Sequence, residues 1–197
     1  NKQVIDYTLD LLLKYGINDL NFCLNFQHEK FLKYFENLSK NKINIRYVLE
    51  NKRMGTIGGI SLFDDFINEH ILIINADIVT DIDLEQFYET FLKQKSDLCI
   101  ATRYFTQNIP YAVIKEKRGK VTSIKEKPEV NFQINSGIYV LKKSLLKKIP
   151  KNTFYDATDF ISDLIKNDHN VNTFNFLDKW IDIGSHKDLK LFKNGDI

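Results

Sequence analysis

The stretch His70-Ile-Leu-Ile-Ile-Asn-Ala-Asp77 places an acidic residue shortly after a nearly continuous apolar run. A run without polar alternation is typical of a strand that other elements cover on both faces. Asp77 would then lie at the carboxyl edge of a parallel sheet, where open α/β folds bind their ligands. We therefore expect an α/β protein with a central strand at His70–Asn75 and a candidate ligand site at the end of that strand.

Strands and helices alternate on both sides of this stretch. Apolar spacing predicts the helices, and Asp83 is placed to cap the helix that follows it. This alternation indicates a three-layer αβα fold with a central, mostly parallel, mixed sheet. The expected helices are Val4–Leu13, Glu29–Leu38, one that follows the turn Met54–Gly59 and runs through Phe66, and Leu84–Lys93. The expected strands are Leu20–Phe26, Ile43–Leu49, His70–Asn75 and Asp97–Thr102.

The pattern changes to short strands after Pro110. We expect these hairpin-like strands to add a mixed or antiparallel section to the same sheet. Because no repeat or linker divides the chain, we expect one domain over residues 1–197. The expected strands are Tyr111–Lys115, Lys120–Lys127, Gln133–Leu141, Val171–Phe176 and Trp180–Ile183, and the expected helices are Lys142–Lys148, Ala157–Lys166 and one after Gly184.

The composition argues against a membrane protein and against a protein that binds nucleic acid. The 197 residues are 43% hydrophobic, which is enough to fill a core. No apolar run approaches the roughly 20 residues needed to cross a membrane, and no leader opens the chain, so we expect a cytoplasmic protein without membrane contact. The 28 Lys+Arg are scattered among 26 Asp+Glu, which argues against a nucleic-acid partner. Cys23 and Cys99 are expected to be inert core residues.

Asp77 and Asp182 are the candidates for a metal site. Asp182 lies in Trp180-Ile-Asp-Ile-Gly184, between apolar residues and in a segment suited to burial. Mg²⁺ beside a phosphate needs only one or two protein carboxylates, because water and phosphate oxygens complete its octahedron. The alternative is that Asp77 turns the chain and that Asp182 accepts backbone N–H groups in a loop.

Three further segments have the composition of a binding site. Met54-Gly-Thr-Ile-Gly-Gly59 allows the backbone to approach a flat or anionic ligand. Glu126-Lys127-Pro128 ends a strand with an acid able to bind hydroxyls and a cation able to bind phosphate, although charged strand ends are usually just solvated. Asn135-Ser-Gly137 interrupts an apolar strand, and glycine inside a strand often marks the close approach of a ligand or another backbone.

Taken in this order, the segments resemble the sugar-1-phosphate nucleotidylyltransferases, the family that makes nucleotide sugars. The order makes the signal specific, since each motif alone is weak. Ile57, Ala76 and Ala112 depart from the family pattern. The matching motifs are the opening helix Lys2–Leu12, Glu50 with Met54–Gly59, Ile73–Asp81, Tyr111–Val113, Glu126–Pro128, Asn135–Tyr139 and Trp180–Gly184.

The resemblance implies a role for each candidate. Asp77 and Asp182 would hold Mg²⁺, and Lys127 would contact the phosphate of the sugar, so these three would be the catalytic residues. A sugar-1-phosphate oxygen would attack the α-phosphorus of a nucleoside triphosphate and release pyrophosphate, without a general base because the attacking group is already an anion. The implied nucleotide site is Glu50, Gly55, Thr56, Gly58 and Gly59, and the implied sugar site is Tyr111, Glu126, Asn135 and Gly137.

One departure from the family is large. The G-x-G-[ST]-R phosphate loop and the first strand, which normally precede the opening helix, are absent from these residues. We therefore expect a fragment of a catalytic domain that has little or no activity by itself. Met54-Gly-Thr56 and Asn152–Asp156 favour the guanylyltransferase-like branch and GTP, while the identity of the base and sugar and the existence of a homo-oligomer stay open.

Two other functions fit parts of the sequence. Asp81-Ile-Asp83 is a D-x-D pattern, which a glycosyltransferase that uses nucleotide sugars would carry. That reading ranks lower, because Asp83 is better explained as a helix cap and because it leaves Asp182 without a role. A non-catalytic domain that binds a nucleotide sugar would fit the absence of the phosphate loop.

Overall fold

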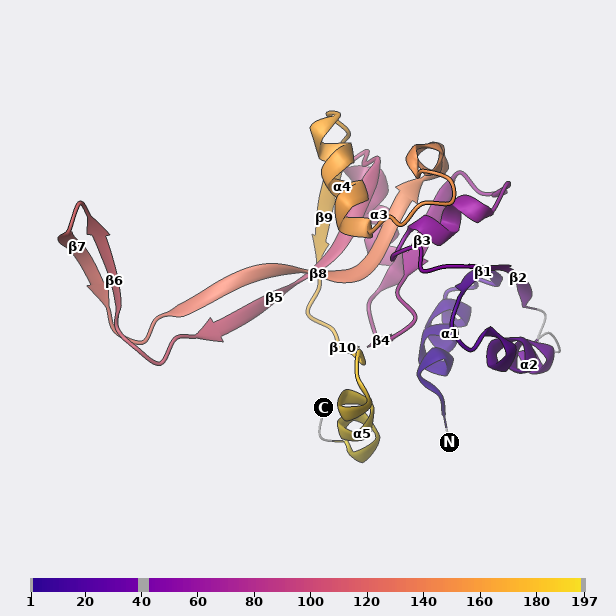
Figure 1. The fold of residues 1–197 in the computed structure, drawn as a ribbon, viewed down its shortest axis with the longest axis horizontal. Helices are drawn as coiled ribbons and strands as arrows, with labels where there is room; N and C mark the ends of the chain where they lie inside the picture. The colour runs from indigo at the N-terminus through magenta and orange to yellow at the C-terminus, as the bar shows by residue number, and fades with distance from the viewer. Residues whose placement is uncertain (1, 39–42, 196–197) are drawn as a thin grey trace.

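A computed structural model describes residues 2–38 and 43–195 (Figure 1), so the ends of the predicted 1–197 domain lie outside the described residues. The helices are α1 (Val4–Lys14), α2 (His28–Leu38), α3 (Leu84–Lys93), α4 (Ala157–Lys166) and α5 (His186–Asn194), with 3₁₀ segments η2 (Gly58–Leu62) and η3 (Lys143–Lys148). The strands are β1 (Asp19–Leu24), β2 (Asn44–Leu49), β3 (His70–Ile74), β4 (Ile78–Thr80), β5 (Leu98–Asn108), β6 (Val113–Lys117), β7 (Lys120–Lys125), β8 (Glu129–Lys142), β9 (Val171–Asn175) and β10 (Trp180–Asp182).

The central sheet has four strands in the order β3-β8-β5-β9. Strand β8 runs antiparallel to both of its neighbours, β3 and β5, while β9 runs parallel to β5. Strands β3, β5 and β9 therefore run in one direction and only β8 runs in the other. The predicted mixed and mostly parallel sheet is confirmed.

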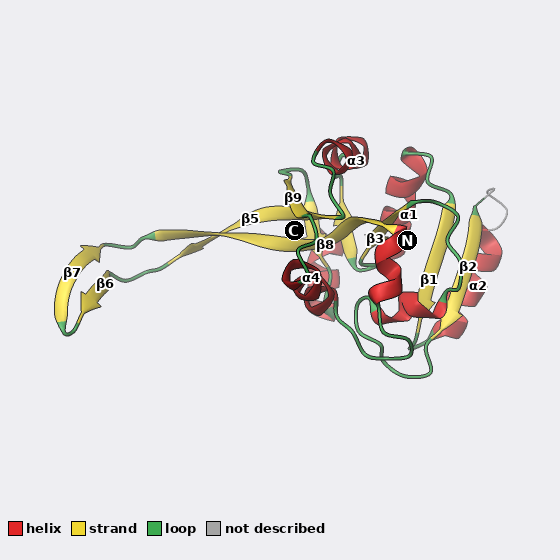
Figure 2. Ribbon diagram, turned by 90° about the horizontal axis from the view of Figure 1, so that it is seen from above, coloured by secondary structure: helices red, strands yellow, loops and turns green. Residues whose placement is uncertain are grey.

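Helices cover both faces of this sheet, with α3 and α4 on opposite sides (Figure 2). Cys99 and Ala101 of β5 pack in the same apolar cluster as Phe87 of α3. Leu98 of β5 packs in a second cluster with Phe160 of α4. Successive residues of a strand point to opposite faces, so one strand supplies both clusters. The predicted three-layer αβα arrangement is confirmed.

Strand β3 lies at an edge of this sheet. The prediction that His70–Asn75 is a central strand is therefore wrong for the described residues. Strand β3 pairs with β8, and all five of its residues are only half-buried. The prediction was based on the apolar side chains of this strand. Among the described strands, only β8 pairs with its backbone.

Two short sheets flank the central one. Strands β1 and β2 pair in parallel, with α2 as the helix between them. Strands β4 and β10 pair antiparallel over three residues each, and Asp182 is the register partner of Ile78. This second pairing brings the C-terminal segment next to the residues that follow β3.

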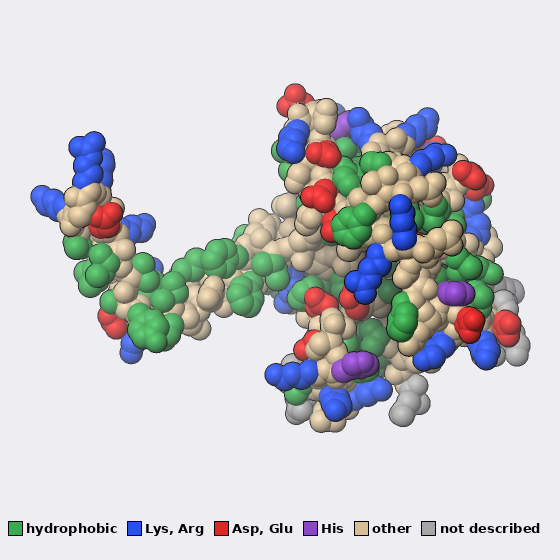
Figure 3. All heavy atoms as spheres, in the orientation of Figure 1, with side chains coloured by type: hydrophobic (Ala, Val, Ile, Leu, Met, Phe, Trp, Pro, Cys, Tyr) green, Lys and Arg blue, Asp and Glu red, His purple; other side chains and the backbone are tan. Residues whose placement is uncertain are grey.

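Strands β5 and β8 continue beyond the sheet as a two-stranded arm, with the β6–β7 hairpin at its far end (Figure 1). The prediction that this hairpin joins the same sheet is wrong, since β6 and β7 form a separate two-stranded sheet. The β5–β8 pairing runs unbroken from Thr102 to Asn108 and carries the hairpin away from the body. Apolar side chains follow the arm in Figure 3. Those exposed are Tyr104, Phe105, Tyr111, Ile114, Val121, Ile124 and Phe132.

Two predicted α-helices form short 3₁₀ segments. The helix expected to reach Phe66 ends at Leu62, and Phe63 is already extended. The helix expected at Lys142–Lys148 is the 3₁₀ segment η3. Runs this short often take the tighter 3₁₀ form as connectors. Within the described ranges, none of the helices has the length and apolar composition to span a membrane.

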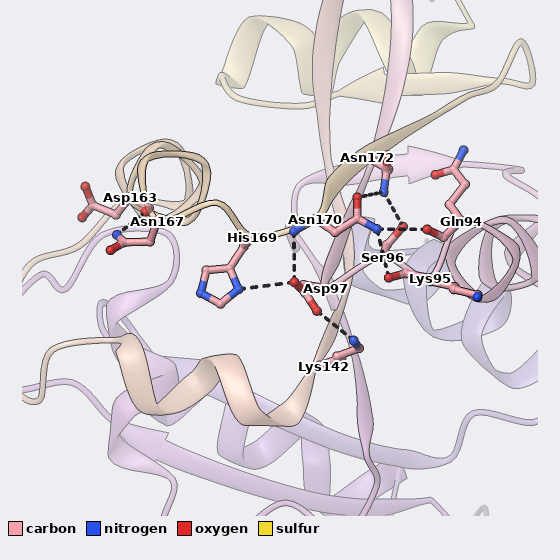
Figure 4. Close-up of polar contacts among 10 residues, drawn as sticks. All are labelled: Gln94, Lys95, Ser96, Asp97, Lys142, Asp163, Asn167, His169, Asn170 and Asn172. Atoms are coloured by element: carbon pink, nitrogen blue, oxygen red, sulfur yellow. Dashed lines mark hydrogen bonds and ion pairs between the residues drawn. The ribbon is translucent and has the colours of Figure 1, made fainter.

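A polar cluster around Asp97 fixes the sheet at the end where β5 begins (Figure 4). The Asp97 carboxylate accepts hydrogen bonds from Lys142 Nζ at 2.8 Å and from the Asn170 amide at 3.0 Å. It also lies 3.3 Å from His169 Nδ1. These partners hold the pKa of Asp97 below its usual value, the Lys142 hydrogen bond most strongly. The cluster links β5, β8 and β9 at the end of the sheet opposite Asp77.

Candidate active site

The structure brings Asp77 and Asp182 together. Asp182 is the register partner of Ile78, and the Ile183 amide donates a hydrogen bond to the Asp77 carbonyl oxygen at 2.9 Å. Both side chains are exposed, so the expectation that Asp182 is buried is wrong. The backbones of two acids that are far apart in the sequence thus lie next to each other, just beyond the carboxyl end of β3.

The two carboxylates repel each other. Partial burial raises the pKa of Asp182 above its usual value, and the charges of Asp77 and then Asp188 raise it further. Two carboxylates in this arrangement fit a hard cation with oxygen ligands, which would offset their repulsion. No group of three or more His, Cys, Asp or Glu side chains in the described part of the chain could hold a metal. A cation held by this pair would take its remaining ligands from water or from phosphate.

Asp77 also lines a large cavity, with a volume of about 1100 Å³. Its wall includes four of the five predicted nucleotide-binding residues, which are Glu50, Gly55, Thr56 and Gly59. Ile183 and Gly184, next to Asp182, line the same cavity. Asp77 and most of the predicted nucleotide site therefore open into one space, whereas Asp182 itself does not line it and only its neighbours Ile183 and Gly184 do.

The glycines of the Met54–Gly59 loop are needed for close packing. Gly55 has a φ of +76°, and a Cβ there would lie 2.5 Å from the Tyr155 carbonyl oxygen. A Cβ on Gly59 would overlap the Glu50 carboxylate and lie 2.9 Å from Cys23 Cβ. Gly58 is buried, and a Cβ there would lie 2.6 Å from the Thr153 carbonyl oxygen, so packing explains this glycine as well.

Asp156 anchors this loop, a contact that its place in the Asn152–Asp156 segment of the sequence did not reveal. Its Oδ1 accepts a hydrogen bond from the Thr56 amide at 3.0 Å, and a longer one from the Thr56 hydroxyl. That hydroxyl lies 2.7 Å from the Ala157 amide at the start of α4 and accepts its hydrogen bond. Asp156 stands directly before a helix, so it looks like an N-cap, yet its side chain makes no cap bond. An acid at a cap position gives no signal that it binds a distant loop.

Glu50 and Cys23 both line the cavity, and both lie against Gly59. Burial raises the pKa of Glu50, and a hydrogen bond from the Met54 backbone opposes this shift. Although the Cys23 residue as a whole is exposed, the protein atoms that surround its thiol shield it from water and raise its pKa to about 12, with a further contribution from the Glu50 charge. Cys99 is fully buried as predicted, whereas Cys23 is exposed and lines the cavity, so its assignment to the core is wrong.

Asn135 and Gly137 lie near the same end of β3. Gly137 has a φ of +75°, and a Cβ there would lie 2.7 Å from the Asn75 side-chain nitrogen. The Gly137 carbonyl accepts a hydrogen bond from the Asn75 amide at 3.0 Å. Asn135 uses its side chain within the protein, accepting from the Gly137 amide and donating to the Tyr139 hydroxyl. Protein contacts thus account for both residues, and their roles toward a sugar stay predictions.

The other predicted sugar-site residues lie on the arm. Tyr111 precedes β6, and Glu126 and Lys127 follow β7, so all three sit near the hairpin at the end of the arm (Figure 1). Lys127 occupies a turn with a φ of +40°. In this conformation the structure does not bring these residues to Asp77 and Asp182, and their roles stay predictions.

The D-x-D pattern is accounted for by local structure. Asp83 caps α3, and its Oδ1 accepts a hydrogen bond from the Gln86 amide at 2.9 Å. The Asp81 amide donates to the Lys179 carbonyl oxygen at 3.1 Å, which fastens the turn after β4. Neither acid lines the cavity that Asp77 borders. The predicted capping role of Asp83 is confirmed, and it removes one of the two acids on which the glycosyltransferase alternative rests.

The chain matches known proteins along nearly its whole length. It is 26% identical over 196 residues to the mannose-1-phosphate guanylyltransferase catalytic subunit beta of Dictyostelium discoideum, covering 95% of this chain and 54% of that protein. It is 24% identical over 207 residues to a UTP--glucose-1-phosphate uridylyltransferase of Synechocystis, covering 95% of this chain and 53% of the relative. The chain thus spans about half the length of the curated relatives it matches.

A solved structure shares the fold. The crystal structure of HddC from Yersinia pseudotuberculosis complexed with GMP-PN has a TM-score of 0.75 at 20% identity, with 100% of this chain and 87% of that chain covered. The family model described as nucleotidyl transferase matches residues 1–195. This match, together with the α/β fold, shows that the chain belongs to the nucleotidyl transferase family.

Proposed function

We propose that the protein is a sugar-1-phosphate nucleotidyltransferase that makes a nucleotide sugar in the cytoplasm, with GTP as the nucleotide donor. The observation that carries the proposal is the pairing of Asp77 and Asp182 at the rim of the cavity that Gly55, Thr56 and Glu50 line. A nucleoside triphosphate in this cavity would have its phosphates beside two acids that suit a divalent cation.

The reaction requires placement more than proton transfer. A sugar-phosphate oxygen forms a bond to the α-phosphorus, the bond from that phosphorus to the β-phosphate oxygen breaks, and pyrophosphate leaves with the electron pair. Since the attacking oxygen is already an anion, the protein has no proton to remove. Glu50, Gly55 and Thr56 would hold the nucleoside so that the two reacting groups lie in line.

Asp77 and Asp182 would hold Mg²⁺. The bound ion supplies charge neutralisation for the phosphates as negative charge shifts to the leaving group. Lys127 would neutralise the phosphate of the sugar, and Glu126 and Tyr111 would contact the sugar ring. These three roles require the arm to lie against the cavity in the substrate complex.

The choice of GTP and of a mannose-type sugar rests on similarity. The Dictyostelium relative is named a mannose-1-phosphate guanylyltransferase, and the Synechocystis relative is named for UTP and glucose-1-phosphate. The solved neighbour is described as complexed with GMP-PN. The Asn152–Asp156 segment, which resembles the guanylyltransferase-like branch, bonds to the glycine loop through Tyr155 and Asp156, so it would lie beside the proposed nucleoside site.

The test is release of pyrophosphate by the full natural protein from GTP and mannose-1-phosphate in Mg²⁺, with UTP, dTTP and CTP compared. Asp77→Asn and Asp182→Asn are each expected to lower kcat/KM by about 100-fold or more. Asp81→Asn is the matched control, because Asp81 is a nearby acid outside the cavity, and it should retain wild-type turnover. Nucleoside diphosphate released from a nucleotide sugar, without pyrophosphate, would support the glycosyltransferase alternative instead.

A further inference from the structure

The arm that carries the β6–β7 hairpin has no core of its own. It is two strands wide, and seven of its large apolar side chains are exposed, four of them aromatic. Phe105 and Phe132 are register partners in the arm, as are Ile114 and Ile124 in the hairpin. An isolated two-stranded ribbon is only marginally stable in water, and a large exposed apolar patch marks a surface that binds another protein. The arm therefore needs a surface to pack against.

Buried hydrogen bonds fix the base of the arm to the body. Ser136 is buried, and its hydroxyl donates to the Ala101 carbonyl oxygen at 2.7 Å. The Ser136 carbonyl oxygen accepts a hydrogen bond from Trp180 Nε1 at 2.9 Å. Thr102 is also buried, and its hydroxyl accepts from Gln133 Nε2 at 2.8 Å. These bonds tie β5 to β8 and tie β8 to β10.

The first residues of the arm also bind the segment after β9. The Arg103 guanidinium donates a hydrogen bond to the Asp178 carbonyl oxygen and lies over the Phe176 ring, 5.2 Å from its centroid. The Phe176 amide donates to the Thr102 carbonyl oxygen at 3.1 Å. Turning the arm at its base would break these contacts and leave buried polar groups without partners, which is costly. The contacts at the base therefore hold the arm in its direction.

The arm carries its tip away from the cavity of its own chain. Seven register pairs follow one another between Thr102 and Asn108 of β5 and their partners on β8. At about 3.3 Å per residue, this ladder is about 20 Å long. Figures 1 and 2 both show it pointing away from the body. Lys127 lies beyond the far end of the ladder, so reaching Asp77 of the same chain would require ladder bonds to break.

The tip of the arm and the cavity carry opposite charges. Residues 111–129 include six lysine and arginine residues and three glutamates, and Figure 3 shows the basic side chains over the hairpin. Among the described residues, those that line the cavity of about 1100 Å³ include Asp19, Glu50, Asp77 and His186 but no lysine or arginine. A basic tip and an acidic cavity attract each other, which favours docking of one on the other.

We propose that the arm docks on a second copy of this chain and places Tyr111, Glu126 and Lys127 at the mouth of that copy's cavity. A second copy is the partner that the charges indicate, because the cavity that the tip complements is on this same chain. In a two-fold dimer the exchange is reciprocal, so each arm is covered and each cavity receives one tip.

Each active site would then be shared between two chains. Asp77 and Asp182 of one copy would hold the cation and the nucleotide phosphates, and Lys127 of the other copy would contact the phosphate of the sugar. The arm keeps the direction that its base imposes, and no bond of the β5–β8 ladder has to break. This inference rests on the proposed function, because it assigns the arm residues of one copy to the sugar-phosphate site of the other.

Co-expression of two inactive variants of the full natural protein tests the exchange. Asp77→Asn disables the cavity and Lys127→Ala disables the tip, so a mixed dimer has one site in which both parts are intact. Random pairing makes about half of the dimers mixed, so pyrophosphate release should recover to about one quarter of the wild-type rate. Co-expressed Asp77→Asn and Asp182→Asn are the control, because both changes disable the cavity and should give no recovery. No recovery with Lys127→Ala would show that each tip serves its own chain and would overturn the inference.

The mass of the same protein in solution needs no turnover, so it separates this inference from the proposed function. Sedimentation equilibrium should show a dimer, and Val121→Lys in the arm should raise its dissociation constant by about 10-fold or more. Ile165→Lys on α4 is the matched control, because both side chains are 57% exposed, and it should leave the dimer intact. A monomeric wild type, or a dimer that Val121→Lys does not weaken, would overturn the inference. A dimer that Val121→Lys weakens but that releases no pyrophosphate would contradict the proposed function and leave the docking of the arm standing.

Discussion

The Ile183 amide and the Asp77 carbonyl oxygen form a 2.9 Å hydrogen bond that joins the C-terminal segment to the loop after β3. In the β4–β10 ladder, Asp182 is the register partner of Ile78, and this hydrogen bond extends the ladder by one residue on each strand. Because the ladder is made of backbone groups, it holds the backbones of Asp77 and Asp182 near each other whatever the charge of their side chains. The proposed cation site is therefore set by backbone pairing before any cation binds.

Replacing Asp77 tests the electrostatic coupling of the pair. The negative charge of Asp77 favours the protonated form of Asp182, so Asp77→Asn should lower the pKa of Asp182 toward its ordinary value. Burial and Asp188 would still act, so part of the shift should remain. NMR titration of the Asp182 carboxyl carbon measures this. A pKa unchanged from wild type would show that the two side chains do not interact, and Asp81→Asn is the control.

Gly59→Ala tests the packing of the glycine loop. The added Cβ would overlap the Glu50 carboxylate and crowd Cys23, so we expect a loss of about 1–3 kcal/mol in the free energy of unfolding. Gly184→Ala is the matched control, because the nearest atom to its Cβ is Asp182 Oδ1 at 3.6 Å. Urea denaturation should place the control within about 0.5 kcal/mol of wild type. Equal stability of the two variants would contradict this account.

Asp156→Ala tests the anchor of the loop. Removing the carboxylate leaves the Thr56 amide without its acceptor, which should cost about 1–3 kcal/mol and speed exchange of that amide. GTP affinity should fall while the fold remains, since Tyr155 backbone bonds still hold Ile57 and Gly58. Asp159→Ala, in the first turn of α4, is the control. Wild-type GTP affinity in Asp156→Ala would show that the anchor does not support binding.

The Asp97 cluster predicts a pH dependence of stability. Its partners lower the pKa of Asp97 in the folded state, so the carboxylate stabilises the fold above its unfolded pKa of about 3.9, and this stability is lost as the pH falls through the folded pKa. Asp97→Asn should therefore cost about 1–3 kcal/mol at neutral pH and progressively less below about pH 4. Thermal unfolding from pH 7 to pH 3 measures the difference. A constant difference across this range would contradict the assignment.

Much of the fold could be predicted because it depends on local pattern. Apolar spacing identified α1, α2, α3 and α4, and the residues at the carboxyl end of β3 line the cavity of about 1100 Å³. Asp83 was identified as a cap because the capping bond joins residues that are close in sequence. The glycine loop was found by composition, and its glycines do pack closely.

The remaining features depend on contacts between distant residues. The β4–β10 ladder has three residues in each strand, too few to show a period, yet it creates the pairing of Asp77 and Asp182. The arm forms because β5 and β8 stay paired beyond the residues that also pair with β3 and β9. This pairing joins two distant segments, so neither segment alone predicts it. The apolar composition of β3 predicted a central strand, whereas β3 lies at the edge of the described sheet. Composition alone does not show how many strands pair with a segment.

Binding of Mn²⁺, as a spectroscopic substitute for Mg²⁺, measures the central claim most directly. Electron paramagnetic resonance of the full natural protein with GTP should show one bound ion, and Asp77→Asn and Asp182→Asn should each weaken its binding by about 10-fold or more. Asp81→Asn should bind Mn²⁺ as the wild type does. Wild-type Mn²⁺ affinity in both Asp77→Asn and Asp182→Asn would contradict the account.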